Sequence, residues 1–334
     1  MPARTGYNFQ HNNLCVNRCL VSLLPVENLS PDDFAFWTPP AGSTVLAGAQ
    51  RQAMELPAFP LPVHRRDLQE DRPSDVAIGQ GVYDYLRQFP DCEGNTLYAE
   101  LLREAYPHFI TDLAAHAVML DAKQVDSSYV FRKLTCLKIL FLLERRNSGL
   151  LLQLCRGFFE LALEFTELAR CRQHLRDAMK FGQELLAMYP ENLQALSLLA
   201  EIDLLLGDAP AAVDKLRRLA AQIDDPILLA RIDARIAGCS FDDSADVTLV
   251  DELESVAEAM HLHTLGDHGG ATGLLERIEE TGRLISTLPS ADFFWLLGVC
   301  RRDNGDIGGA FTALEKALSL EPDHPAALAA LNTL

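Results

Sequence analysis

Apolar residues recur at helical spacing through most of the chain from Val76 onward. The pattern predicts helices at residues 76–89, 96–120, 127–145, 148–171 and 172–189, with a break or a new start at Pro107. The helix that begins at Ser127 is apolar on most sides, so we expect it to lie at the centre of a bundle. The pattern therefore predicts an all-α fold for this part of the chain.

The first 75 residues follow a different pattern. They hold 9 of the 17 prolines, each of which removes a backbone donor and restricts the residue before it, so long helices are excluded there. We expect Phe34, Phe36 and Trp37 to be buried against the helices, because three neighbouring aromatic side chains are rarely left in water. The predicted division is a proline-rich, mostly non-helical N-terminal arm (1–75), an apolar helical bundle (76–158) and a helical repeat array (159–334) continuous with the bundle.

The clearest internal repeat spans residues 291–324. It places apolar residues on the facing sides of two helices, a glycine at the turn between the helices and a proline after them: Phe294, Leu297, Gly298, Gly305, Ala310, Leu314, Ala317 and Pro322. Small residues let the two helices approach closely, and the glycine supports the turn. Residues 193–226 repeat the scheme around Gly207, and residues 252–285 repeat it around Gly266, with Ser255 and Glu258 where apolar residues are expected.

These units resemble tetratricopeptide repeats (TPRs), a family of paired helices with a period of about 34 residues that stack into an α-α solenoid. The resemblance covers residues 159–334, and no family resemblance is found for residues 1–158. The unit at 291–324 departs from the family pattern at the usual aromatic position, where Arg301 stands. Residues 227–250 do not complete a repeat, so we expect the stack to be interrupted or bent there. Residues 325–334 are predicted to form a closing helix that covers the last apolar face.

The resemblance implies that the array binds another protein, because in this family the first helix of each pair lines a concave face. Carried over residue by residue, it implies a partner-binding groove made of Gln194, Ser197, Glu201, Val256, Met260, His263, Asp292, Trp295, Val299 and Arg302. Trp295 is the candidate anchor, since a large amphipathic ring buries much area at little entropic cost. Packing of Trp295 against a neighbouring or closing helix is the alternative. We therefore expect a non-catalytic scaffold or assembly chaperone.

Charge narrows the class of partner. Residues 191–334 carry 25 Asp and Glu against 10 Lys and Arg, a net charge of −15 out of −18 for the whole chain. An acidic surface repels phosphate backbones and anionic lipids, so we expect neither nucleic acid nor membrane as a partner. A basic or mixed-charge protein segment is the expected partner, and self-association is left open. A solvated face that keeps the array soluble is the alternative explanation.

Composition adds an expectation about the compartment. The longest apolar stretch, residues 150–168, is interrupted by charged residues, so no membrane span is predicted. The first residues have no apolar core beside their basic residues, so we expect no cleaved secretion signal. The eight cysteines are scattered, and several lie inside helical patterns, as reduced thiols do. We expect a cytoplasmic protein.

Candidate chemistry is sparse. No phosphate loop, nucleophile elbow, zinc-protease helix or kinase motif is present, so no catalytic residue and no cofactor are predicted. His108, Asp112 and His116 follow one another at four-residue spacing, which puts them on one face of a helix. An enzyme or a metal-binding protein with its site around these three residues is the alternative to the scaffold.

A second polar group surrounds the turn of the weak repeat, and it consists of His261, His263, His268 and Asp267. Polar residues are expected at such a turn in any case. No grouping supplies four metal ligands at workable spacing, so no tightly bound metal is predicted.

Overall fold

The structure, a computed structural model, describes residues 29–48, 52–68, 72–121, 127–239 and 247–334. The helices in these ranges are α1 (Asp75–Gln88), α2 (Asn95–Ala105), α3 (Pro107–Asp121), α4 (Ser127–Leu143), α5 (Ser148–Leu163), α6 (Cys171–Met188), α7 (Leu193–Leu206), α8 (Ala209–Ala220), α9 (Pro226–Gly238), α10 (Leu249–Thr264), α11 (His268–Thr281), α12 (Arg283–Thr287), α13 (Ala291–Asp303), α14 (Ile307–Leu320) and α15 (Pro325–Leu331). The strands are β1 (Phe34–Trp37), β2 (Thr44–Ala47), β3 (Gln52–Glu55) and β4 (Leu61–His64), and the 3₁₀ turns are η1 (Pro31–Asp33), η2 (Arg65–Asp67) and η3 (Phe165–Arg170). The all-α prediction is confirmed, and every strand in the described ranges precedes α1.

The described part of the N-terminal arm folds back onto the helices as two antiparallel strand pairs, β1 with β4 and β2 with β3. β4 is buried along its length and packs against α1. Phe34 is 1% exposed and stacks on His64, with ring centroids 4.8 Å apart. The expected burial of Phe36 is wrong, because half of its surface is exposed even though its ring contacts Tyr85 edge-on. The β1–β4 sheet has only two strands, so α1 covers the ring of Phe34 and leaves much of the ring of Phe36 in water.

Helices α1 to α4 form the predicted bundle next to these strands. α4 packs against α1, α2, α3 and α5, so its expected central place is confirmed. The expected break at Pro107 is also confirmed, because α2 ends at Ala105 and α3 starts at Pro107. Proline suits the first position of a helix, where its missing N–H needs no partner.

The predicted helix at 148–171 is wrong over its last turns. α5 ends at Leu163, and Glu164 has extended dihedrals of φ −69° and ψ 125°, after which the chain continues as η3. This change of direction places η3 against α10, which a continuous helix would not reach. The predicted boundary between residues 158 and 159 falls inside α5, and the division into three parts stays a prediction.

Three helix pairs repeat one turn geometry, and they are α7 with α8, α10 with α11, and α13 with α14. In each turn a glycine at positive φ is followed by an aspartate whose carboxylate accepts a hydrogen bond from the third residue beyond it: Gly207 and Asp208, Gly266 and Asp267, Gly305 and Asp306. Such a carboxylate caps the second helix. Within the last pair, a Cβ at Gly298 would lie 2.8 Å from Leu314 Cγ, so α13 and α14 approach too closely for any larger residue. The predicted helix pairs are confirmed for the described residues after 193.

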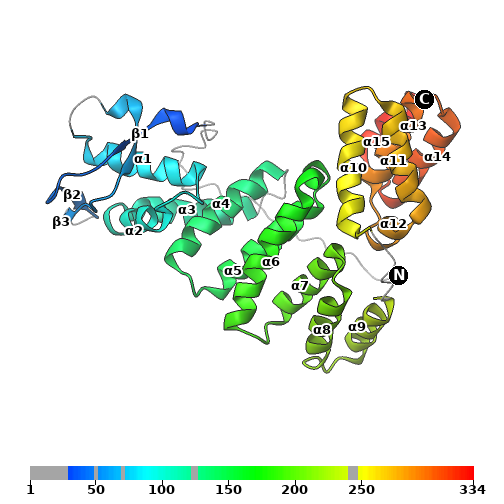
Figure 1. The fold of residues 1–334 in the computed structure, drawn as a ribbon, viewed down its shortest axis with the longest axis horizontal. Coiled ribbons are helices and arrows are strands. Elements are labelled where there is room, and N and C mark those ends of the chain that lie inside the picture. The colour runs from blue at the N-terminus through cyan, green and yellow to red at the C-terminus, as the bar shows by residue number, and fades with distance from the viewer. Residues whose placement is uncertain (1–28, 49–51, 69–71, 122–126, 240–246) are drawn as a thin grey trace, which may run out of the picture.

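The stack bends after the first of these pairs, as expected for residues 227–250 (Figure 1). α9 packs on α8 and buries none of its own side chains, whereas α10 packs beside η3, α6 and α7. Arg172 on α6 reinforces this packing, since its Nη2 lies 2.5 Å from Asp251 Oδ1 and 3.2 Å from Glu254 Oε2 on α10. Helices α10 to α15 therefore form a block on one side of the array.

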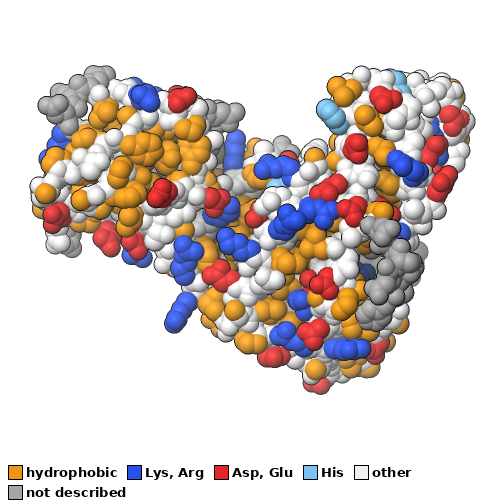
Figure 2. Space-filling view, viewed as in Figure 1, with side chains coloured by type: hydrophobic (Ala, Val, Ile, Leu, Met, Phe, Trp, Pro, Cys, Tyr) orange, Lys and Arg blue, Asp and Glu red, His pale blue; other side chains and the backbone are white. Residues whose placement is uncertain are grey.

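One large hydrophobic core extends from the strands to α15, and a smaller cluster joins α7, α8 and the residue after α9. α15 packs on α13 and α14 and buries Ala327 and Ala330, so the predicted closing helix is confirmed. Figure 2 shows a broad hollow between the N-terminal part and the α10–α15 block, with side chains of both charge signs on its floor. Among the described residues, no helix is both long enough and apolar enough to cross a membrane.

Candidate protein-binding groove

A groove of about 470 Å³ lies between η3 and helices α10, α12 and α13. Most of its lining is apolar, from Leu163, Phe165, Leu168, Leu253, Val256, Leu284, Ile285, Leu288, Pro289, Ala291 and Phe293. Its polar lining consists of Glu164, Thr287, Ser290 and Asp292, of which two are acidic. We call this site the η3 groove. Its composition, apolar with a few polar groups at fixed places, is typical of binding sites.

Two short segments that depart from the repeat pattern create the η3 groove. On one side, the break at Glu164 directs η3 across the end of α5. On the other side, Gly282 at φ 65° turns the chain out of α11 into the five-residue α12. Ser290 then starts α13, because its hydroxyl accepts a hydrogen bond from the backbone N–H of Phe293. The groove therefore occupies the place where the array deviates from regular stacking.

Trp295 lies beside the η3 groove on α13 and is partly buried. Its ring contacts Phe165 of η3 edge-on and also lies near His324, with centroids 6.3 Å apart in both cases. His324 Nδ1 accepts a hydrogen bond from Ala327 N, and its Nε2 lies 3.0 Å from Asp292 Oδ1. Because Nδ1 is an acceptor, Nε2 carries the proton and donates it to the Asp292 carboxylate. One connected set of contacts thus joins η3, α13 and α15.

The residues predicted for the partner-binding groove are not all in one place. Val256 and Asp292 line the η3 groove, although Val256 is only 1% exposed and forms part of its floor. On α7, Gln194 and Ser197 are exposed, and Glu201 pairs with Arg235 of α9. The remaining five, Met260, His263, Trp295, Val299 and Arg302, are all partly buried. That they act together as one groove stays a prediction.

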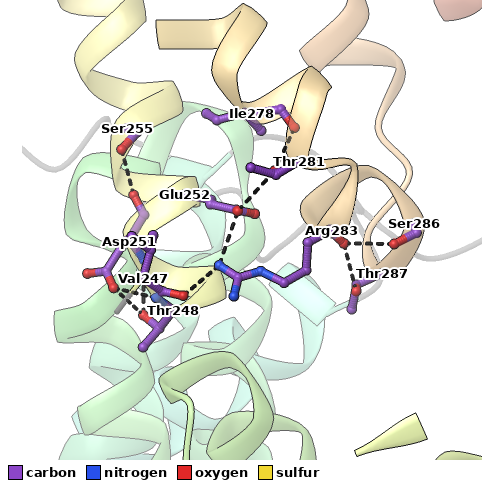
Figure 3. Close-up of polar contacts among 10 residues, drawn as sticks. All are labelled: Val247, Thr248, Asp251, Glu252, Ser255, Ile278, Thr281, Arg283, Ser286 and Thr287. Atoms are coloured by element: carbon purple, nitrogen blue, oxygen red, sulfur yellow. Dashed lines mark hydrogen bonds and ion pairs between the residues drawn. The ribbon is translucent and has the colours of Figure 1, made fainter. Parts of the chain in front are cut away.

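A second hollow, of about 490 Å³, opens where α10 begins and faces α11 and α12 (Figure 3). Arg283 extends from α12 and donates from Nη2 to Val247 O at 2.6 Å and to Glu252 Oε1 at 3.1 Å. Thr281 Oγ1 also lies 3.3 Å from Glu252 Oε1. The other carboxylate oxygen of Glu252 and the Nε of Arg283 are buried without a partner in the described structure. Glu252 and Arg283 were not predicted as functional residues. They lie on α10 and α12, and the apolar periodicity of the sequence does not show that these two helices are in contact.

The alternative site around His108, Asp112 and His116 is not gathered into a ligand set. His108 and Asp112 are exposed on α3, and the ring of His108 lies against Phe109. In the described ranges, the group of three metal-ligating side chains whose ligand atoms converge lies elsewhere, in the α10–α15 block.

The buried thiols are poor nucleophiles. Burial raises the pKa of Cys155 to about 12 and that of Cys300 to about 12, because a thiolate is poorly solvated inside the core. The six cysteines in the described ranges are unpaired, and five of them are buried. These residues contribute to packing, as expected from their positions in helical patterns.

Among known proteins, similarity to this chain was found in solved structures. No family model matches the chain, and no curated protein does. Among solved structures, MamA protein is 15% identical over 63% of this chain and 92% of its own, with a TM-score of 0.27. A thermophilic TPR protein from Thermus thermophilus, TTC0263, is 15% identical over 67% of this chain and 97% of its own, with a TM-score of 0.26. The α-helical repeat architecture is therefore established by the helix pairs of this chain itself.

Proposed function

We propose that the protein is a non-catalytic interaction scaffold or assembly chaperone that holds a segment of a partner protein in the η3 groove. The observation that carries this proposal is the apolar groove itself, bordered by the Trp295–Phe165 contact and lined by two acidic residues. Helix-lined apolar grooves bind partner segments through a few buried anchors.

The chemistry of the groove specifies the kind of segment. Its apolar floor accepts one or two large aliphatic or aromatic side chains. Glu164 is exposed at the end of α5, and the Asp292 side chain is 46% exposed. Both carboxylates favour a Lys or Arg beside the apolar anchor, in agreement with the acidic repeat half. The proposed ligand is therefore a basic or mixed-charge segment of another protein, bound in a reducing compartment such as the cytoplasm.

Purification of the tagged chain from its own cells, followed by mass spectrometry, identifies what is bound. The affinity of that partner is then measured for wild type, Trp295→Ala and Glu164→Lys. Loss of the aromatic anchor is expected to speed dissociation at a cost of about 2 kcal/mol, whereas the charge reversal is expected to slow association in a salt-dependent way.

Glu315→Lys on α14 is the matched control, because Glu315 is also exposed and its substitution changes the net charge by the same amount. It is expected to bind as wild type does. Helical content and melting temperature establish that each variant is folded. A folded Trp295→Ala variant with unchanged affinity would show that the partner binds elsewhere. If Glu315→Lys weakens binding as much as Glu164→Lys does, the negative charge of the groove does not contribute specifically to binding.

A further inference from the structure

Three helix ends meet at one corner of the α10–α15 block and bring together two histidines and an aspartate. His263 lies in the last turn of α10, His268 is the first residue of α11, and Asp303 is the last residue of α13. Each offers one ligand atom, and these atoms all lie within 4.8 Å of one another. Asp303 comes from the next helix pair along the chain, which is why the sequence grouped the histidines with Asp267 and not with Asp303.

We propose that His263, His268 and Asp303 bind one divalent transition-metal ion of the zinc type. His263 Nε2 lies 2.9 Å from Asp303 Oδ2 in a hydrogen bond, which the ion would replace. The ring of His268 has its centroid 5.0 Å from that of His263. Bonds of about 2.0–2.2 Å to a shared ion require the His263–Asp303 hydrogen bond to open and the three side chains to turn toward one point.

His268 supplies an independent sign of a ligand. Its Nδ1 is buried and has no hydrogen-bond partner in the described structure. A buried polar atom without a partner is costly, and that cost is removed when Nδ1 itself is the atom that binds the ion. The backbone carbonyl of His268 is already used, since it accepts from Thr272 Oγ1 at 2.8 Å, so the residue is held in place at the start of α11.

Neighbouring polar groups hold the Asp303 carboxylate in place. Arg302 Nε donates to Asp303 Oδ1 at 2.8 Å, which orients the carboxylate and leaves Oδ2 for the ion. The same guanidinium donates from Nη1 to Thr333 Oγ1, so it is anchored on its far side. Asp267 is not part of the set, because its Oδ1 caps α11 by accepting from Gly270 N.

The donor set defines the class of ion. Two imidazole nitrogens and one carboxylate oxygen suit Zn²⁺ and its neighbours Co²⁺ and Ni²⁺, whereas Mg²⁺ and Ca²⁺ prefer sites made entirely of oxygen. Three protein ligands leave a coordination position for water or for a group of a partner. The bound ion would cross-link two successive helix pairs. His263 was expected to contact the partner directly, whereas in this proposal it binds the ion.

Titration of the full chain after chelator treatment tests the proposal. Calorimetry with ZnCl₂ is expected to show saturable binding of one equivalent, and the melting temperature is expected to rise with zinc because the ion binds the folded state more tightly than the unfolded chain. The absorption spectrum with CoCl₂ is expected to show the visible bands of Co²⁺ bound by nitrogen and oxygen. MgCl₂ and CaCl₂ are expected to give neither effect.

Variants locate the ion. His263→Ala, His268→Ala and Asp303→Asn are each expected to lose the zinc-dependent rise in melting temperature. His261→Ala, an exposed residue on the same helix, is the matched control and is expected to keep it. A wild-type chain that binds no equivalent of Zn²⁺ or Co²⁺ overturns the proposal whatever the variants do. Binding that survives in His263→Ala and Asp303→Asn also overturns it, and so does a Co²⁺ spectrum dominated by sulfur-to-metal charge transfer.

Discussion

The ring of Trp295 lies edge-on against the ring of Phe165, with their centroids 6.3 Å apart, although the two residues belong to opposite halves of the sequence. This contact fixes α13 to η3 across one side of the η3 groove. Trp295 therefore has a structural role as well as its proposed role in binding. The two roles can be separated, because stability is measured without a partner.

Removal of the indole is expected to weaken the attachment of α13 to η3. Trp295→Ala should lower the free energy of unfolding by about 2–3 kcal/mol, since a large, partly buried ring is lost and a cavity remains. Phe311→Ala on α14 is the control, because Phe311 is an aromatic residue whose surface is 46% exposed. Denaturant unfolding of both variants checks the difference. Equal losses would mean that Trp295 contributes no more than a surface ring.

Two glycine-to-alanine changes are expected to have opposite signs. Gly298→Ala should destabilise the fold by about 1–3 kcal/mol, because the new methyl group would overlap Leu314 and force α13 away from α14. Gly273→Ala on α11 meets no atom within 4 Å, so it should stabilise the fold by about 0.5–1 kcal/mol through helix propensity alone. Thermal and denaturant melts of the pair provide the measurement. A neutral Gly298→Ala would show that the two helices have room to separate.

Removing one partner of the Glu252–Arg283 ion pair is expected to destabilise the fold, whereas replacing both partners with leucine is expected to cost little stability. Glu252 is 5% exposed, so Arg283→Leu should leave its carboxylate poorly compensated and lower the free energy of unfolding by about 2 kcal/mol. This value is below that of a fully buried pair, because about a third of the Arg283 side chain is in water. The double change Glu252→Leu and Arg283→Leu should recover most of the loss. A double variant less stable than either single variant would contradict this.

Stability is expected to fall on mild acidification because of His174. Burial lowers the pKa of His174 from its ordinary value of 6.5, against the opposing effect of the nearby Glu167. Between the two pKa values the unfolded chain binds a proton that the folded chain does not, so stability decreases as the pH falls below about 6.5 and stops decreasing once the folded pKa is passed. His174→Leu should show a smaller decrease between about pH 7 and pH 5 in denaturant melts. An identical pH profile for wild type and variant would exclude His174 as the cause.

Local features of the fold could be predicted from the sequence. The helix pairs followed from apolar periodicity, and each turn from a glycine between the two helices, whereas the aspartate that caps each second helix was found in the structure. The break at Pro107 followed from the geometry of proline. These signals act within a few residues of the chain, so a single sequence contains them.

Contacts between distant helices could not be predicted in this way. Arg301 stands where the tetratricopeptide pattern has an aromatic residue, and the structure shows that it pairs with Glu276 at 3.1 Å and Glu279 at 2.7 Å on α11. An ion pair thus replaces ring packing between successive pairs. The η3 groove likewise depends on the turn at Glu164, which no proline or glycine signals.

The thin packing of α9 gives the array an uneven distribution of local stability. No side chain within this helix is buried, Ile227 is 72% exposed, and the Arg235–Glu201 pair supplies a polar contact to α7. We therefore expect opening at α9 to cost much less free energy than global unfolding, and we expect its amides to exchange with solvent through this partial opening. Each opening uncovers apolar side chains of α8 beside Val213 and Leu216. The middle of the array thus behaves as a frayed end, while the true C-terminal end is closed by α15.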